Sequence, residues 1–520
     1  MKEASKGYIL MISLIVALGG FLMGFDASVI SGVVRFIEPE FGLSKLQIGW
    51  AVSSLTLTAT LAMMLVGPLS NRIGRRKVLS YAAAVYTISA ILSALAPNFI
   101  FLVIARMIGG FGVGASLIIA PMYIAETSPP KLRGRLVSLN QLNIVIGISA
   151  AFFTNYLILK WGQSESSWAK TMQFDVYNWR WMLGLEALPA IIYFMALFMV
   201  PRSPRWLIMQ GFDEEAKNVL CKSVGELKAD SDILEVKESL KLDAEKPKKK
   251  WIDIFHPSLK VVLLIGVVLA ILQQITGINS VFFYAPMIFE QSGIGADAAF
   301  SQAIYVGLVN LLFTLVAISM IDKLGRKPLL IFGLLGIAIS MFVLSWGFSK
   351  ASYQFDSENI GNQAIVSLNN EITSMDQETY YNEDEFLLAA SKYLTPEELS
   401  INKSTLLENS IHLNSTLILI AILSFVASFA VSIGPVMWVL FSELFPNSVR
   451  AIAISFVGFV NSVISFMVQL VFPWELETLG SSLTFLIYGA FAALGLFFVI
   501  FKVPETKGKS LEELEKYLIK

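Results

Sequence analysis

Two ionisable residues stand inside stretches of sequence that are otherwise apolar, where their chemistry would be proton binding. Asp26 lies in the middle of a hydrophobic run, and Arg106 is the only cation inside another. On insertion scales, a charge at the centre of a membrane helix costs about 2.5 to 3.5 kcal/mol, so such residues are paired or neutralised. Because arginine keeps its proton in proteins, Asp26 is the residue of the two that could titrate.

Neutral amides in apolar runs point to a second kind of chemistry, the binding of hydroxyl groups. These amides are Gln141, Gln273, Gln274, Asn279 and Asn310. A sugar presents a ring of hydroxyls, and amides offer both donors and acceptors without the desolvation cost of a charge. Trp438 follows the helix-breaking pair Gly434-Pro435 and could lay its indole against a sugar ring. The alternatives are amides that join helices and a tryptophan that faces lipid.

The composition predicts that membrane helices position these residues. Of the 520 residues, 55% are hydrophobic and 15% are charged, whereas soluble domains carry about 25% charged residues. A soluble catalytic domain is therefore excluded, as are a disulfide-rich scaffold, because Cys221 is the only cysteine, and a nucleic-acid partner, because the net charge is −1. Twelve runs are long enough to span a bilayer: 8–30, 48–69, 78–96, 99–123, 137–160, 180–200, 260–290, 299–321, 328–348, 414–441, 450–472 and 480–502.

The charged residues outside these runs predict the orientation of the chain. Lysine and arginine gather after the second, fourth, eighth and twelfth runs, so both termini are expected in the cytoplasm. The acidic segment 351–413 is then exterior, and Thr395-Pro396-Glu397-Glu398 within it has the form of a helix start; disorder is the alternative. The segment 202–258 is expected to form cytoplasmic linker helices followed by the basic run 246–250, a solvated anchor or a contact for anionic lipid.

The chain also repeats itself in parallel. Asn71–Lys77 after the second run resembles Asp322–Lys327 after the eighth, and Glu126 with Arg133 recurs as Glu443 with Arg450. Two parallel halves are typical of alternating-access transporters with a site between them. We therefore expect an all-α membrane protein of two six-helix halves, divided as residues 1–201, a linker 202–258, residues 259–503 with the insert 351–413, and a tail 504–520.

At these motifs the sequence resembles the sugar porter family of the major facilitator superfamily, with the pattern nearest to bacterial proton–xylose symporters. The resemblance covers nearly the whole chain except the insert. It rests on motifs that occur in the family's order: Gly24-Phe25-Asp26, Asn71-Arg72-Ile73-Gly74-Arg75-Arg76, Pro121–Glu126 with Arg133-Gly134-Arg135, Gln273–Asn279, Gly434–Trp438 with Ser442-Glu443, and Pro504–Gly508.

The resemblance implies roles for individual residues. It implies that Asp26 and Arg106 face each other and couple transport to protons, with Glu186 as a second acidic coupling position. A static ion pair and a hydrogen-bonded Glu186 are the alternatives. The implied sugar-binding residues are the five amides and Trp438, together with Phe283, Tyr284 and Asn461. A cytoplasmic gate of reciprocal acids and bases is implied for Arg75, Arg76, Glu126, Arg133, Arg205, Asp322, Arg326, Glu443, Arg450 and Glu505, the alternative being simple positive-inside anchors.

The sequence departs from the family pattern at three positions. Phe283 stands where the family has a tyrosine, and Ser462 follows Asn461 where the family has tryptophan, so a wider pocket is expected. Arg202 replaces the usual acid of the motif that follows the sixth run, which puts that part of the gate in doubt.

Together these features predict proton-coupled uptake of a monosaccharide or related polyol by alternating access. A facilitative uniporter and a transport-dead sugar sensor are the alternatives, and no nucleophile or metal cluster supports an enzyme. We expect a monomeric, multi-pass protein of the cell membrane whose partners are the sugar, the proton and the lipid bilayer, with no cofactor and no nucleic acid.

Overall fold

A computed structural model describes residues 6–245, 251–354, 378–381, 383–395, 399, 406–407, 410–446, 449–509 and 513–514. Within these residues, eleven helices are long and apolar enough to cross a membrane. The last of them, α21, bends at Gly480 and contains two of the predicted spans, so the twelve predicted runs are all helical. The basic run 246–250, and residues 396–398 of the predicted helix start in the insert, lie outside the described residues.

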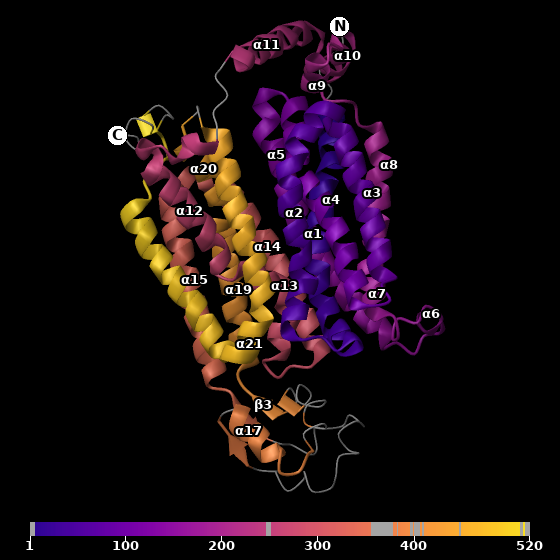
Figure 1. The fold of residues 1–520 in the computed structure, drawn as a ribbon, viewed down its shortest axis with the longest axis vertical. Helices are drawn as coiled ribbons and strands as arrows, with labels where there is room; N and C mark the ends of the chain where they lie inside the picture. Colours follow the sequence, from indigo (N-terminus) through magenta and orange to yellow (C-terminus); the bar gives the residue numbers. More distant parts are fainter. Residues whose placement is uncertain are drawn as a thin grey trace.

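The first half of the chain forms one bundle (Figure 1). Ser44 begins the second helix with a capping box in which its side chain and that of Gln47 satisfy each other's backbone amides. The sixth span is broken at Glu186, which precedes α8. The elements are α1 Lys6–Phe41, α2 Lys45–Ile73, α3 Arg75–Ala94, α4 Phe99–Thr127, α5 Pro130–Gly162, the short α6 Ser167–Thr171, α7 Asn178–Gly184, α8 Ala187–Ala196 and the 3₁₀ turn η1 Leu197–Met199.

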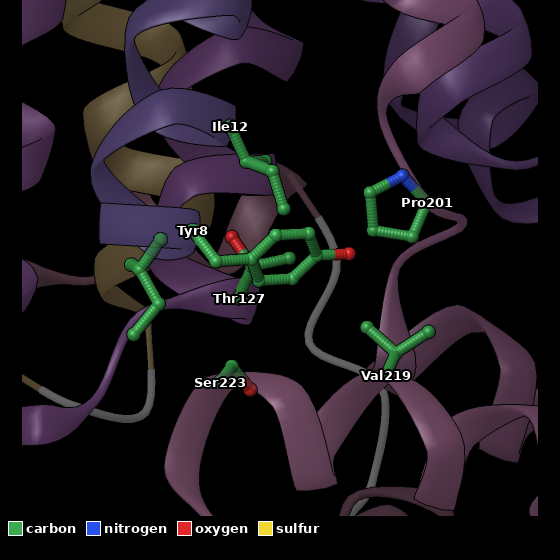
Figure 2. Close-up of a pocket in the computed structure, with 7 residues that line it drawn as sticks. Tyr8, Ile12, Thr127, Pro201, Val219 and Ser223 are labelled. Atoms are coloured by element: carbon green, nitrogen blue, oxygen red, sulfur yellow. The ribbon is translucent and has the colours of Figure 1, made fainter. Parts of the chain in front are cut away.

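Three helices of the linker cover one end of this bundle, which we call the linker end: α9 Pro204–Met209, α10 Asp213–Val224 and α11 Glu226–Glu245 (Figure 1). Figure 2 shows where α10 approaches the bundle, with Val219 and Ser223 facing Tyr8 of α1 and Thr127 of α4. The cavity between them measures about 10 Å³, room for about one water molecule. It is therefore a packing gap and too small for a sugar.

The second half forms the other bundle, and two of its spans are broken. Gly277 has a left-handed backbone (φ 92°) that separates α12 from α13, a conformation that favours glycine. Ser432 separates α19 from α20 two residues before Gly434. The elements are η2 Trp251–Phe255, η3 Pro257–Leu259, α12 Lys260–Ile275, α13 Ile278–Glu290, α14 Ala296–Leu324, α15 Arg326–Ser349, α19 Ser415–Val431, α20 Ile433–Leu444 and α21 Arg450–Lys502.

The insert forms a small polar layer at the opposite end of the molecule, which we call the insert end (Figure 1). Its strands β1 Ser352–Gln354, β2 Thr379–Tyr380 and β3 Ile411–His412 pair antiparallel in the order β2-β1-β3. The helix α17 Glu383–Ala390 contributes Phe386 to a local core beside Tyr353 and Tyr380. Part of the insert is therefore folded.

The two bundles meet through α1, α2 and α5 of the first half and α13, α14 and α21 of the second. A side-chain carbon added at Gly49 of α2 would lie 2.0 Å from the carbonyl oxygen of Leu470 in α21, so these two backbones are in direct contact. Ion pairs cross the interface where Lys160 binds Asp297 (2.7 Å) and Arg35 binds Glu290. These contacts lie toward the insert end, and the helices diverge toward the linker end (Figure 1).

Candidate functional site

The ionisable residues at membrane depth meet inside the first bundle. Arg106 of α4 is 1% exposed and places Nη1 3.4 Å from Oδ1 of Asp26 in α1, which is 3% exposed. The same guanidinium donates from Nε to the carbonyl oxygen of Ala51 in α2, at 2.9 Å. Arg106 therefore joins three helices, and one of its contacts depends on the charge of Asp26.

Glu186 adds a second buried carboxyl to this cluster. It is 3% exposed, it lies at the break between α7 and α8, and it is within electrostatic reach of Asp26 and Arg106. In the described chain, Oδ2 of Asp26, Nη2 of Arg106 and Oε1 of Glu186 are buried without a hydrogen-bond partner. Buried charges are stable only when they are paired or neutralised. Two carboxyls and one guanidinium are neutral together only when one carboxyl carries a proton.

The second bundle contains a different cluster, built from neutral amides. Gln273 donates from Nε2 to the carbonyl oxygen of Gly434 (3.1 Å), next to the break between α19 and α20. Gln274 donates to Oδ1 of Asn461 (3.1 Å), and Asn461 donates to Oε1 of Gln273 (2.8 Å). These three predicted sugar-binding residues thus touch one another, and each is at most 7% exposed.

Asn279 extends the amide cluster to residues that the sequence analysis missed. Its Nδ2 donates to Oε1 of Gln274 and to Oγ of Ser465, both at 2.6 Å. Ser465 also accepts from Nε2 of Gln469 (2.8 Å), and Oε1 of Gln469 accepts from Thr56 of the first bundle (2.9 Å). The spacing of 461, 465 and 469 places these polar residues on one face of a helix, a signal that the sequence did carry.

The other predicted sugar-binding residues lie in α5, α13, α14 and α20, and one of them contacts the backbone of this network. Tyr284 is fully buried and donates its hydroxyl to the carbonyl oxygen of Gln469 (2.8 Å), and Phe283 beside it is 8% exposed. Trp438 of α20 is 45% exposed, with its ring 3.7 Å from a side-chain carbon built at Gly458. Gln141 of α5 is exposed, and Asn310 of α14 is buried. Their sugar-binding roles stay predictions.

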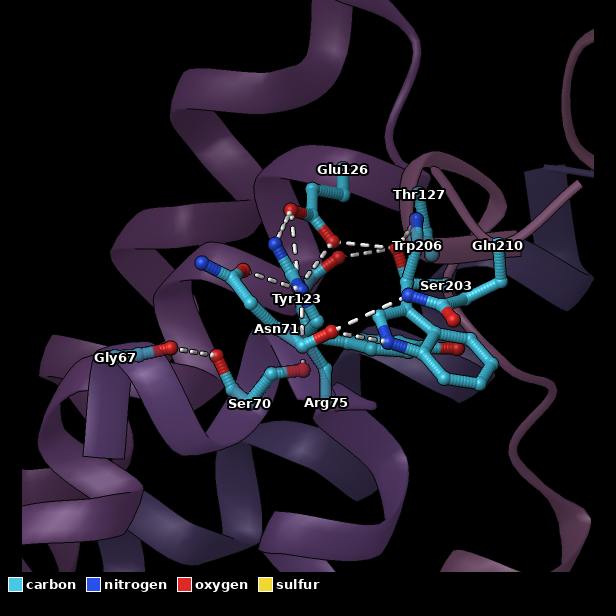
Figure 3. Close-up of polar contacts among 10 residues, drawn as sticks. All are labelled: Gly67, Ser70, Asn71, Arg75, Tyr123, Glu126, Thr127, Ser203, Trp206 and Gln210. Carbon is cyan, nitrogen blue, oxygen red and sulfur yellow. Dashed lines mark hydrogen bonds and ion pairs between the residues drawn. The ribbon is translucent and has the colours of Figure 1, made fainter. Parts of the chain in front are cut away.

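Two of the predicted gate residues of the first half, Arg75 and Glu126, lie in one compact cluster at the linker end (Figure 3). Arg75 binds Glu126 through Nε and Nη2, with a shortest distance of 3.0 Å, and reaches Oδ1 of Asn71 at 2.9 Å. Ser203, at the start of α9, donates its hydroxyl to the same carboxylate. Trp206 then donates to the carbonyl oxygen of Asn71 (3.0 Å), so α9 is held against α2 and α4.

The second half builds the corresponding cluster with one difference. Arg326 binds Glu443 at 2.8 Å, and Thr506 donates to that carboxylate at 2.6 Å, as Ser203 does in the first half. Glu505, however, accepts from the backbone amides of Arg326 (3.1 Å) and Lys327 (3.0 Å) at the start of α15. A carboxylate there is favoured by the helix dipole.

Arg202, which stands where Glu505 stands in the repeat, has no such role. It lies 3.4 Å from Glu215 of α10, and both side chains are more than 40% exposed. Among the remaining predicted gate residues, Arg76 donates to the carbonyl oxygen of Phe198 (3.2 Å) and Arg450 to that of Phe445 (2.9 Å). Arg133, Arg205 and Asp322 lie in α5, α9 and α14.

Comparison with known proteins identifies relatives along the whole chain. The family described as "Sugar (and other) transporter" matches residues 12–368 and 399–518. The arabinose-proton symporter of Bacillus subtilis is 34% identical over 100% of this chain and 97% of its own length. The D-xylose-proton symporter of Escherichia coli is 35% identical, with 99% of this chain and 96% of the relative covered.

Solved structures of similar proteins include the xylose transporter XylE from Escherichia coli. Its partially occluded, inward-open structure is 33% identical and superimposes with a TM-score of 0.73 over 97% of this chain and 100% of that one. The proton:xylose symporter XylE bound to 6-bromo-6-deoxy-D-glucose has a TM-score of 0.70 and 33% identity, over 98% of this chain and 99% of that one.

Proposed function

Since the chain belongs to the sugar (and other) transporter family, we propose that it imports a monosaccharide or related polyol together with a proton, by alternating access. The observation that carries this proposal is the buried cluster of Asp26, Arg106 and Glu186, because a uniporter has no need for titratable groups at this depth. The sugar-proton symporters named above are similar over nearly their whole length.

Proton coupling follows from the charge balance of that cluster. While Asp26 is ionised, it holds the guanidinium of Arg106 between α1 and α4. A proton on Asp26 removes that attraction, while Arg106 keeps its charge and its contact with the carbonyl of Ala51. The contact between α1 and α4 therefore weakens when the proton binds, which allows the helices of the first bundle to shift.

The amide network supplies the sugar site in this proposal. In the structure the amides of Gln273, Gln274, Asn279 and Asn461 form hydrogen bonds with one another, as buried polar groups require. A sugar would exchange these contacts for bonds to its hydroxyls, which both donate and accept. Trp438, half exposed beside the break at Ser432, supplies an apolar face for the ring.

The contacts between the bundles support a state that is closed at the insert end. The ion pairs Lys160–Asp297 and Arg35–Glu290 cross the interface there, whereas Arg75–Glu126 and Arg326–Glu443 each stay within one half at the linker end. The similarity to XylE structures described as inward open agrees with this state. In the opposite state, the two linker-end clusters would come together as a gate.

The placement of the chain in the membrane is part of the same proposal. The two halves, residues 1–201 and 259–503, would move as units joined by the linker 202–258, with the tail 504–520 beside the second half. The basic residues of the linker-end connections favour the cytoplasmic side for that end and for both termini. We further propose a monomer in the lipid bilayer of the cell membrane, with the acidic insert 351–413 outside.

The test is uptake into proteoliposomes that hold the purified chain. With the outside more acidic than the inside, a panel of labelled pentoses, hexoses and inositol should contain at least one compound that accumulates above its external concentration. A protonophore should release it. Protein-free liposomes are the control.

Two outcomes would point elsewhere. Transport that only equilibrates the sugar and ignores the pH gradient would identify a uniporter. Binding of a sugar with no movement of it across the membrane would favour a sensor.

A further inference from the structure

One hydrogen bond between the two bundles connects directly to the amide network. Thr56 of α2 donates from Oγ1 to Oε1 of Gln469 in α21, at 2.9 Å. Gln469 is 1% exposed, and its Nε2 donates to Ser465, which also accepts from Asn279. A continuous chain of hydrogen bonds therefore runs from Gln274 through Asn279, Ser465 and Gln469 to the other half of the molecule.

Contacts from two other helices hold the backbone of α21 in place at Gln469. Its backbone carbonyl accepts from the hydroxyl of Tyr284 (2.8 Å), which stands at the kink inside α13. Its neighbour Leu470 touches Gly49 of α2, where the two backbones are in contact. The side chain of Gln469 therefore lies where α2, α13 and α21 meet, and its rotation is restricted.

We propose that Gln469 is a positioning residue that links occupancy of the sugar site to the contact between the two halves. This inference rests on the proposed function. Ser465 has one hydroxyl oxygen that accepts from both Asn279 and Gln469. When a sugar hydroxyl accepts the hydrogen bond from the Asn279 amide, Ser465 accepts from Gln469 alone. The hydrogen bond between Ser465 and Gln469 is then stronger and holds the Gln469 amide in its orientation toward Thr56. Sugar binding therefore strengthens closure at the insert end.

Two substitutions separate this role from simple packing. Thr56→Val keeps the shape of the side chain and removes the donor. Thr60→Val is the control, because Thr60 lies one turn further along the same helix, is itself buried, and donates within the helix to the carbonyl of Thr56 (2.8 Å). In proteoliposomes, Thr56→Val should lower the kcat of uptake about 2- to 10-fold, the size of one net hydrogen bond. Thr60→Val should transport as the wild type does.

A double substitution tests whether the two residues act through one bond. Gln469→Leu should lower kcat at least as much as Thr56→Val, and adding Thr56→Val to it should produce no further loss. Additive losses, or equal behaviour of Thr56→Val and Thr60→Val, would each overturn the proposal.

A distance measurement gives a readout that does not depend on transport. Spin labels at Leu46→Cys of α2 and Thr478→Cys of α21, both exposed positions in different halves, report the insert end in a Cys221→Ser background. Adding the transported sugar should shift the wild-type distances toward the closed state, and Thr56→Val should abolish that shift. An unchanged response in Thr56→Val overturns the link. If the wild type moves no sugar, the proposed function fails, and the sugar-free distances in Thr56→Val still decide whether the bond holds the insert end closed.

Discussion

The two halves bury different polar groups. The first half buries charge, in Asp26, Arg106 and Glu186, whereas the second buries neutral amides around Gln274 and Asn461. A charged cluster responds to protonation, and an amide cluster responds to hydroxyl groups. If the two clusters have the roles proposed above, proton and sugar act on different bundles, and any coupling between them must cross the interface.

At the linker end, by contrast, the polar clusters of the two halves are similar. Arg75–Glu126 with Ser203 and Arg326–Glu443 with Thr506 repeat the same two contacts. The halves differ at the next position, where Glu505 caps α15 and its counterpart Arg202 pairs with Glu215 of α10. The predicted gate contacts thus occur in both halves, whereas the buried charges and the amide network each lie in one half.

The largest effect is expected from Asp26→Asn, which removes the titrating group but keeps the side-chain shape. Accumulation of sugar against its gradient should be lost completely, because a neutral amide cannot exchange a proton. Counterflow between equal sugar concentrations should survive, because it needs no net proton movement. The matched control is Asp175→Asn in the exposed connection before α7. Loss of counterflow together with accumulation would argue for a static ion pair.

The two gate pairs should differ in their contribution to stability. The side chains of Arg75 and Glu126 are 5% and 10% exposed, against 12% and 21% for Arg326 and Glu443. Breaking a buried pair costs about 3 kcal/mol or more, because an uncompensated charge remains. We expect Glu126→Gln to lower the free energy of unfolding in detergent by about 3 kcal/mol, and Glu443→Gln by less.

The reference for that comparison is Glu165→Gln, because the Lys170–Glu165 pair is largely exposed and should contribute almost nothing. Equal losses for Glu126→Gln and Glu443→Gln would show that burial does not distinguish the two clusters.

Gln274→Ala should weaken the binding of the sugar and leave the dependence of transport on protons unchanged. Removing one amide that is 7% exposed should raise the Kd of the transported sugar about 10-fold, or about 1.4 kcal/mol. Titration calorimetry on the purified protein measures this change, with exposed Gln210→Ala at the linker end as the control. An unchanged Kd would assign Gln274 to helix association instead.

The smallest effect is expected at Glu505 and its counterpart Arg202, where the two halves differ. Glu505→Ala should destabilise the protein by about 1 kcal/mol, because the amides at the start of α15 lose their acceptor. Arg202→Glu should raise the stability by a few tenths of that amount, because the new carboxylate could accept from the amides at the start of α3. The exposed pair that it removes, Arg202 with Glu215, contributes little. Thermal unfolding of both variants measures these two stability changes. A Glu505→Ala protein that is more stable than the wild type would contradict the prediction.

Much of the fold and part of the site follow from the sequence. Apolar runs placed the spans, and the break near Gly434-Pro435 was expected, although the structure places it at Ser432. Gln273, Gln274 and Asn279 were selected as amides inside apolar helices, and the structure brings them together. Ser465 and Gln469 were missed because they matched no family motif, although their spacing from Asn461 marked a polar helix face.

By itself, the sequence determined that the chain belongs in lipid, how many times it crosses, and which few residues carry charge or amides at depth. It determined these features because hydropathy and charge depend on the chain's own composition. Only the tertiary structure decided which polar groups touch: that Arg106 reaches Ala51 as well as Asp26, and that Thr56 meets Gln469, 413 positions away. Such partners depend on how the helices cross, and the periodicity of a single helix does not contain that information.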